Sequence, residues 1–216
     1  MKIISHRGYK YKENTLEAIN YAFNIPYVSG VEFDVRISKD KKFVLFHDYF
    51  LNRMTSAHGV LNNTSYRKLK KYDLGGGRIP LLKNVLKLET NKIFMLEIKF
   101  SYKEYLKNKR KFLRLLNKFK NKNIYICSFN KKIINDLKNK TNFKLGIIST
   151  KQIKDKEVNF YSINYLTFTN DYLKKLKNKE VFLWTINNKN DINKIKGKNI
   201  GIITDYVERF KGVRWI

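Results

Sequence analysis

The chain has 216 residues, a length that fits one or two domains and buries enough apolar surface to fold without disulfides or a structural metal. Its single cysteine, Cys127, excludes an intrachain disulfide and fits a reducing compartment. Lysine and arginine number 46 against 18 acidic residues, so the formal net charge is +28. Such a charge can attract polyanions, but the lysines are spread along the whole chain, which favours compositional drift over a specific nucleic-acid interface.

The first expected strand is the short apolar run Ile3-Ile4, which ends at a histidine, an arginine and a glycine (residues 6–8). This run is too short to be the apolar core of a signal peptide, and no stretch of the chain reaches the apolar length that spans a bilayer. We therefore expect a soluble, cytoplasmic protein.

Short apolar runs that are typical of buried strands recur along the chain. Amphipathic segments with helical spacing lie between most of them, the clearest over residues 105–119, with others around 133–137, 173–176 and 192–195. The expected strands cover residues 2–5, 31–37 with 43–46, 93–98, 124–128, 145–149, 160–163, 181–186 and 200–204.

Strands that alternate with helices predict a parallel sheet with crossover helices, and strands that are apolar on both faces fit such a sheet. The count of eight strand regions favours a closed (β/α)8 barrel over an open doubly wound sheet. The chain length implies a compact barrel with short loops. No linker, low-complexity segment or domain-scale break interrupts the pattern, so we expect residues 1–216 to form a single barrel domain.

Charged residues gather at the expected carboxyl ends of the early strands, where barrel enzymes place their chemistry. Glu32, Asp34 and Arg36 share one face of the second strand, and Glu97 and Lys99 share one face of the next. Ion pairs, such as Glu32 with Arg36 or Glu97 with Lys99, would explain either group alone. Three converging carboxylates repel one another, and a divalent cation, Mg²⁺ or Ca²⁺, would relieve that repulsion. We therefore predict a metal site at Glu32, Asp34 and Glu97.

Two of the three histidines, His6 and His47, flank this cluster, whereas His58 lies in an ordinary loop. A pair of imidazoles beside a cation suits general acid–base catalysis. Arg7 and Lys99 would stabilise negative charge on phosphoryl oxygens. The combination indicates a phosphate site with His6 and His47 as the catalytic pair.

Several short motifs follow one another in a distinctive order over nearly the whole chain. They are His6-Arg7-Gly8, Glu13-Asn14-Thr15 with Ala18, Gly30-Val-Glu32-Phe-Asp34-Val, Val44-Leu-Phe-His47-Asp48, Leu51-Asn-Arg53-Met-Thr55, Ile79-Pro80-Leu-Leu and Glu97-Ile-Lys99, with weaker matches at Cys127-Ser128-Phe129, Trp184-Thr185-Ile186-Asn187 and Ile203-Thr204-Asp205-Tyr206. In this order and spacing the chain resembles the glycerophosphodiester phosphodiesterase family.

The resemblance implies a TIM-type barrel that hydrolyses small-molecule glycerophosphodiesters to sn-glycerol 3-phosphate and an alcohol. It implies the same metal ligands, acid–base pair and phosphate-binding residues as those named above. Glu13 is then a further polar contact near the metal or the glycerol. Trp184 is an apolar wall of the pocket, with a core aromatic as the alternative. The loop from Arg53 to Gly59 departs from the family pattern, which leaves the leaving alcohol open.

Other functions fit parts of the sequence. The same site would serve a lysophospholipase D-like enzyme, whose basic surface would make peripheral contact with an anionic membrane. A polyanion-binding protein without catalysis is a further alternative, although no specific nucleic acid is expected. The nucleophile is either water or the neighbouring glycerol hydroxyl. We place His6 on the nucleophile side and His47 on the leaving-group side.

Overall fold

The computed structural model describes residues 1–153, 157–176, 179–192, 195 and 200–212. The strands are β1 (Lys2–His6), β2 (Gly30–Ile37), β3 (Phe43–Leu45), β4 (Ile93–Ile98), β5 (Ile124–Ser128), β6 (Lys144–Ser149), β7 (Phe160–Asn164), β8 (Glu180–Trp184) and β9 (Ile200–Thr204). All except β3 run parallel, and β1 pairs with both β9 and β2, so these eight strands close into a barrel. The (β/α)8 barrel expected from the sequence is confirmed.

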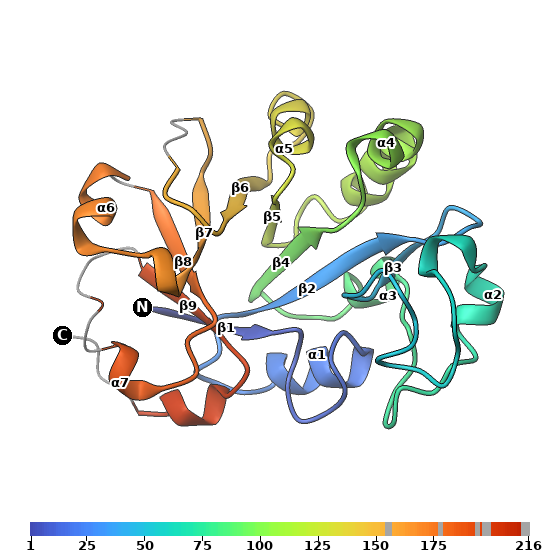
Figure 1. Ribbon diagram of the computed structural model, residues 1–216, viewed down its shortest axis with the longest axis horizontal. Helices are drawn as coiled ribbons and strands as arrows, with labels where there is room; N and C mark the ends of the chain where they lie inside the picture. Colours follow the sequence, from blue (N-terminus) through green and yellow to red (C-terminus); the bar gives the residue numbers. More distant parts are fainter. Residues whose placement is uncertain (154–156, 177–178, 193–194, 196–199, 213–216) are drawn as a thin grey trace.

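Helices connect the strands and surround the barrel, as Figure 1 shows. They are α1 (Leu16–Phe23), α2 (Tyr66–Leu69), α3 (Leu82–Val85), α4 (Tyr102–Asn117), α5 (Lys131–Leu137), α6 (Asn170–Lys175) and α7 (Lys189–Ile192), with 3-10 turns η1 (Leu61–Asn63), η2 (Tyr165–Thr167) and η3 (Val207–Phe210). The longest, α4, begins before the predicted residue 105, because Ser101 and Glu104 form a capping box. Part of the helix predicted at 192–195 lies outside the described residues.

The region 43–46, which the sequence analysis treats as an extension of the second strand, is a separate antiparallel strand. β3 folds back along β2 after a turn in which Ser38 N–H donates to the carbonyl of Lys42. The backbone N–H of Phe46 then donates to the carbonyl of Asp34 at 3.1 Å. This return brings the next residue, His47, back to the level of Asp34.

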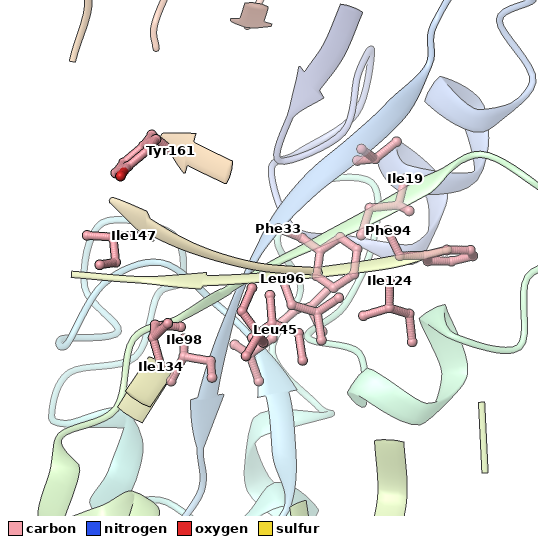
Figure 2. Packing of buried hydrophobic residues seen from close by; sticks show 14 of the residues in the cluster. Ile19, Phe33, Leu45, Phe94, Leu96, Ile98, Ile124, Ile134, Ile147 and Tyr161 are labelled. Atoms are coloured by element: carbon pink, nitrogen blue, oxygen red, sulfur yellow. The ribbon is translucent and has the colours of Figure 1, made fainter. Parts of the chain in front are cut away.

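The strands separate two apolar cores. The outer core lies between strands and helices and includes Phe33, Phe94 and Leu96, which Figure 2 shows packed closely together. The inner core fills the barrel and is made by side chains that alternate with the outer ones along each strand. The inner core consists of Ile4, Ile93, Met95, Tyr125, Cys127, Ile148, Phe160, Phe182 and Ile203.

Aromatic rings and glycines lie together inside the barrel, toward the amino-terminal ends of the strands. Gly146 is in register with Phe160, and Gly201 is in register with Phe182. A Cβ atom on Gly146 would lie 2.4 Å from the Phe160 ring, and one on Gly201 would lie 2.6 Å from the Phe182 ring. The rings of Tyr125 and Phe160 lie 5.2 Å apart between centroids. The glycines therefore leave space for an aromatic floor that closes the amino-terminal end of the barrel.

The segment between β3 and β4 projects beside β2 (teal in Figure 1) and has a small core of its own. Leu51, Leu61, Leu69 and Leu74 contribute to this core. It supports the loop that follows His47. None of the helices in the described part of the chain combines the length and the apolar character that crossing a membrane requires.

Candidate active site

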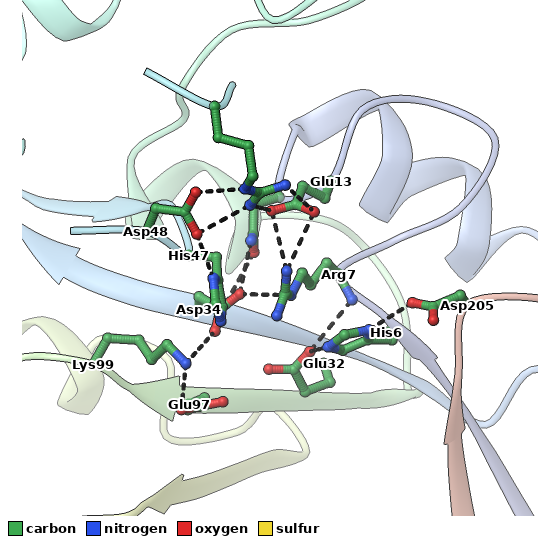
Figure 3. A network of polar contacts seen from close by, with 12 residues as sticks. His6, Arg7, Glu13, Glu32, Asp34, His47, Asp48, Glu97, Lys99 and Asp205 are labelled. Carbon is green, nitrogen blue, oxygen red and sulfur yellow. Dashed lines mark hydrogen bonds and ion pairs between the residues drawn. The ribbon is translucent and has the colours of Figure 1, made fainter. Parts of the chain in front are cut away.

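The predicted metal ligands lie on two neighbouring strands, β2 and β4, beside His6 of β1. The register pairs His6 with Glu32 across β1 and β2, and Asp34 with Glu97 across β2 and β4. Because side chains alternate along a strand, Glu32, Asp34 and Glu97 all point into the barrel. Each offers an oxygen atom that lies within 4.8 Å of the other two (Figure 3). The long stretch of chain between residues 34 and 97 therefore does not separate them in space.

Burial makes this cluster electrostatically unfavourable without a positive charge. Glu32 is 4% exposed and Asp34 is 0% exposed. Burial, and then the nearby charges of Asp34 and Glu97, raise the pKa of Glu32 well above its ordinary value. Burial and Asp34 likewise raise the pKa of Glu97. Burial also acts to raise the pKa of Asp34, but Lys99 and Arg7 together hold that pKa below its ordinary value.

Two oxygen atoms of the cluster are short of partners. Among the described residues, Glu32 Oε1 and Asp34 Oδ1 are buried without a hydrogen bond. Asp34 Oδ1 has only an ion-pair contact of 3.4 Å with Lys99 Nζ. Buried carboxylate oxygens usually bind hydrogen-bond donors or cations. Because Mg²⁺ and Ca²⁺ prefer several hard oxygen ligands, this donor set fits a divalent cation.

The loop after β1 holds Asp34 in place. Asn14 Nδ2 donates to Asp34 Oδ2 at 2.8 Å, and Asn14 Oδ1 accepts from the backbone N–H of Asp34 at 2.9 Å. Arg7 and Asn14 adopt φ angles of 57° and 60°, which residues other than glycine seldom adopt. Gly8 is needed here because a Cβ atom at this position would lie 2.6 Å from Cβ of Ala18 in α1. The loop is thus anchored both to β2 and to α1.

Two positively charged side chains, Arg7 and Lys99, lie between the carboxylates. Arg7 Nε lies 3.1 Å from Asp34 Oδ2, and its Nη1 donates to Glu13 at 3.2 Å. Lys99 Nζ donates to Glu97 Oε1 at 2.8 Å. Burial acts to lower the pKa of Arg7 and of Lys99, but the surrounding carboxylates raise both above their ordinary values. Both side chains therefore remain charged and have fixed positions.

His6 is held by a carboxylate from the last strand of the barrel. Its Nδ1 lies 2.6 Å from Asp205 Oδ1, and its Nε2 lies 3.9 Å from Glu32 Oε2. Asn187 Nδ2 donates to Asp205 Oδ2 at 2.8 Å and so fixes the carboxylate. When Nδ1 donates to Asp205, Nε2 is the nitrogen that can accept a proton.

His47 has a similar carboxylate partner. Its Nδ1 lies 2.6 Å from Asp48 Oδ1, and its backbone carbonyl accepts from Arg36 Nε at 2.8 Å. Arg36 therefore positions His47 and makes no ion pair with Glu32 among the described residues. Burial lowers the pKa of His47. Burial acts to raise the pKa of Asp48, but hydrogen bonds from Arg53 and His47 lower it to about 2.

Arg53 joins the two halves of this network. It donates to both carboxylate oxygens of Asp48 and to both of Glu13, which in turn accepts from Arg7. The sequence analysis expects Glu13 near the metal or the glycerol. The structure places it between Arg7 and Arg53, outside the residues that line the cavity, and its contact with the metal or the glycerol stays a prediction. His58 contacts Asn52 in its own loop.

A cavity of about 310 Å³ opens between the two histidines. One side is polar and the other is apolar, with the rings of Phe129 and Trp184 in an edge-to-face arrangement 6.1 Å apart. Trp184 is therefore a wall of the cavity, and it also packs against the inner core. The lining residues are His6, Arg7, Glu32, His47, Glu97, Lys99, Cys127, Phe129, Ile148, Ser162, Trp184, Thr185 and Ile203.

Several side chains that hold the site residues in position were not among the site residues predicted from the sequence. Asp205 and Asn187 orient His6, Asp48 orients His47, and Asn14 holds Asp34. Asp48 and Asp205 could have been predicted from the sequence, because each is an acidic residue just after the carboxyl end of a strand. The contacts of Asn14 with Asp34 depend on a left-handed loop conformation, for which an asparagine alone is weak evidence.

The comparisons with known proteins agree with this geometry. The sequence model of the glycerophosphoryl diester phosphodiesterase family matches residues 6–209. The chain is 28% identical over 227 residues to a glycerophosphodiester phosphodiesterase of Caldanaerobacter subterraneus subsp. tengcongensis, which covers 94% of this chain and 93% of that protein. It is 30% identical to the glycerophosphodiester phosphodiesterase of Thermotoga maritima, whose crystal structure superimposes with a TM-score of 0.78 over 98% of this chain and 97% of the other.

A third similar structure is a phosphodiesterase of Oleispira antarctica in complex with the product sn-glycerol-3-phosphate. It superimposes with a TM-score of 0.85 at 22% identity, over 95% of this chain and 93% of the other. At this identity the likeness supports the shared barrel fold.

Proposed function

Because the chain belongs to the glycerophosphoryl diester phosphodiesterase family, we propose that it hydrolyses glycerophosphodiesters to sn-glycerol 3-phosphate and an alcohol. It is a phosphoric diester hydrolase, as are its relatives. The observation that carries the proposal is the convergence of Glu32, Asp34 and Glu97 beside two carboxylate-bound histidines. The substrate is a small molecule, in keeping with the volume of the cavity.

Glu32, Asp34 and Glu97 would bind the divalent cation, Mg²⁺ or Ca²⁺. Support comes from the unsatisfied oxygens of Glu32 and Asp34 and from the raised pKa of Glu32. When bound, such a cation would neutralise negative charge on the phosphoryl oxygens. Arg7 and Lys99 line the cavity beside it and would bind the phosphate from the protein side.

His6 and His47 would transfer the protons. Each has its Nδ1 against an aspartate, so each has Nε2 free to face a substrate. We assign His6 to the nucleophile side and His47 to the leaving-group side. His6 would accept the proton of the nucleophile, which is water or the neighbouring glycerol hydroxyl, and His47 would protonate the departing alkoxide oxygen.

The apolar half of the cavity favours a second candidate substrate. Phe129, Ile148 and Trp184 offer a surface that a bare glycerol does not need. A lysophospholipid would place part of its apolar chain there, as in a lysophospholipase D-like reaction. For both substrates we propose a cytoplasmic location and peripheral contact with an anionic membrane.

The test is the release of glycerol 3-phosphate from glycerophosphocholine and glycerophosphoethanolamine with Mg²⁺, with Ca²⁺ and with EDTA. We expect release that EDTA abolishes, and that Glu32→Ala with Asp34→Ala also abolishes. Glu89→Gln is the matched control, because the Glu89 side chain is 91% exposed on the surface. Absence of release with either metal would overturn the proposal for soluble diesters, and the assay would then be repeated with lysophospholipids.

A further inference from the structure

The exposed hydrophobic side chains of the barrel are concentrated around the opening of the cavity. Nine large hydrophobic residues are exposed in the described part of the chain, and six of them lie in loops or in the 3-10 turn η2 at the end of the barrel that carries the site. These six, which we call the mouth rim, are Tyr11, Tyr49, Phe50, Phe129, Leu166 and Tyr206.

The placement of the rim follows from the topology. Parallel strands have their carboxyl ends at one end of the barrel, so the loops that follow β1, β5, β7 and β9 meet there. Tyr49 and Phe50 lie between His47 and Arg53, which belong to the site itself. Leu166 is 87% exposed and Phe50 is 57% exposed. Single exposed apolar residues are common, but a group on one face marks an interaction surface.

Basic side chains accompany the rim. Lys10 and Lys12 flank Tyr11, Lys131 and Lys132 follow Phe129 closely, and all four lysines are exposed. None of them forms an ion pair with an acidic side chain of the described residues. Aromatic side chains next to uncompensated lysines are typical of proteins that bind the interface of an anionic lipid bilayer.

The rim is continuous with the apolar side of the cavity. Phe129 is 49% exposed at the rim, and its ring also meets that of Trp184 inside the cavity. An apolar path therefore leads from the outer surface to the site. The exposed rim and the apolar side of the cavity are therefore parts of one surface.

We propose that the mouth rim docks the barrel on the surface of an anionic phospholipid bilayer, with the cavity facing the lipid headgroups. The inference rests on the proposed function, because a glycerol phosphodiester is also the linkage in a phospholipid headgroup. The aromatic and leucine side chains enter the interface, and the lysines contact the anionic headgroups. The positive net charge of the chain favours the encounter.

The opposite end of the barrel provides a comparison surface. A groove of about 970 Å³ lies there between the carboxyl ends of α4 and α5, and most of its lining residues are lysines and asparagines, with Leu113, Leu116, Ile124 and Phe143 among the others. Lys138 and Lys140 of this groove pair with Glu157 and Asp136. None of the large hydrophobic residues exposed in the described part of the chain lines it. The groove therefore carries positive charge but none of these large exposed hydrophobic side chains.

The test is sedimentation of the full chain with phosphatidylglycerol vesicles and with phosphatidylcholine vesicles, in EDTA so that turnover does not interfere. We expect binding to phosphatidylglycerol and little to phosphatidylcholine. Phe50→Ser with Leu166→Ser should weaken binding by about tenfold or more, because two side chains no longer enter the interface. Lys12→Gln with Lys131→Gln should weaken it more than Lys118→Gln with Lys120→Gln, which removes the same charge from the opposite end.

The docking proposal would be overturned by no sedimentation of the wild type, by equal loss from the two lysine pairs, or by unchanged binding of the Phe50 and Leu166 variant. Self-association or DNA binding in place of vesicle binding would also overturn it. Turnover of soluble glycerophosphocholine is measured in parallel. The Phe50 and Leu166 variant should keep this turnover, so a failure of the proposed function and a failure of docking give different patterns.

Discussion

His6 and Asp205 are 199 positions apart in the sequence, yet His6 Nδ1 lies 2.6 Å from Asp205 Oδ1, because β1 and β9 are neighbours in the closed barrel. The aspartate fixes the imidazole and leaves Nε2 directed toward the carboxylate cluster. Asp205 is thus a positioning residue for the proposed proton transfer by His6.

Asp205→Asn should lower kcat by at least about tenfold and leave KM within a few-fold, because general acid–base catalysis contributes roughly 10²–10⁴-fold and depends on the orientation of the imidazole. Asp171→Asn on the surface of α6 is the control, since its side chain is 82% exposed. A kcat equal to that of the wild type would show that the contact has no catalytic role.

The Glu32→Gln variant distinguishes the role of Glu32 in metal binding from its effect on the stability of the fold. The pKa of Glu32 is raised in the folded state, so the ionised carboxylate opposes folding at pH values above its ordinary pKa. In EDTA at pH 7 the variant should unfold at the same temperature as the wild type or higher. Saturating Mg²⁺ or Ca²⁺ should raise the Tm of the wild type by roughly 5–10 °C and leave the variant unchanged. Thermal unfolding with and without metal provides the measurement, and a wild type that responds to neither cation would refute the site.

Arg53 should be sensitive even to a conservative change. Its guanidinium donates to Asp48 and to Glu13 at the same time, which a lysine ammonium cannot reproduce in the same geometry. Arg53→Lys and Arg53→Ala should both lower kcat, by about tenfold for alanine and less for lysine. Steady-state kinetics test this, with Arg67→Ala in α2 as the control. Full activity in Arg53→Ala would mean that Asp48 holds His47 unaided.

Asp136 provides a test of stability far from the site. It accepts hydrogen bonds from Tyr105, Lys109 and Lys140. Burial acts to raise the pKa of Asp136, but these donors lower it from 3.8 to about 2. Because the folded pKa is depressed, the stabilisation is present above the unfolded value of 3.8 and is lost as the pH falls toward about 2.

Asp136→Asn should therefore reduce the free energy of unfolding at pH 7 by about 1–3 kcal/mol, a difference that shrinks between pH 4 and pH 2. Urea unfolding at several pH values measures it. Asp171→Asn again serves as the exposed control. A difference that is constant with pH would contradict the assigned pKa.

The strands and the convergence of the three carboxylates could be predicted from the sequence, because a buried parallel strand leaves a continuous apolar run and its register places Asp34 beside Glu97. Partners that depend on closure of the barrel were not predictable in this way. Asp205 meets His6 only because the last strand returns to the first. The position of His47 depends on β3 folding back along β2, which the apolar pattern of residues 43–46 does not distinguish from a longer strand.

The aromatic floor of Tyr125, Phe160 and Phe182 has a consequence for the passage of molecules. It closes the amino-terminal end of the barrel below the carboxylates, so in the described part of the chain the cavity faces the loops at the carboxyl ends of the strands. A substrate of the proposed reaction would enter, and its products would leave, at this end of the barrel. In the proposed reaction, glycerol phosphate that had not yet left would occupy the place of the next substrate, so the products would have to leave before the next substrate could bind.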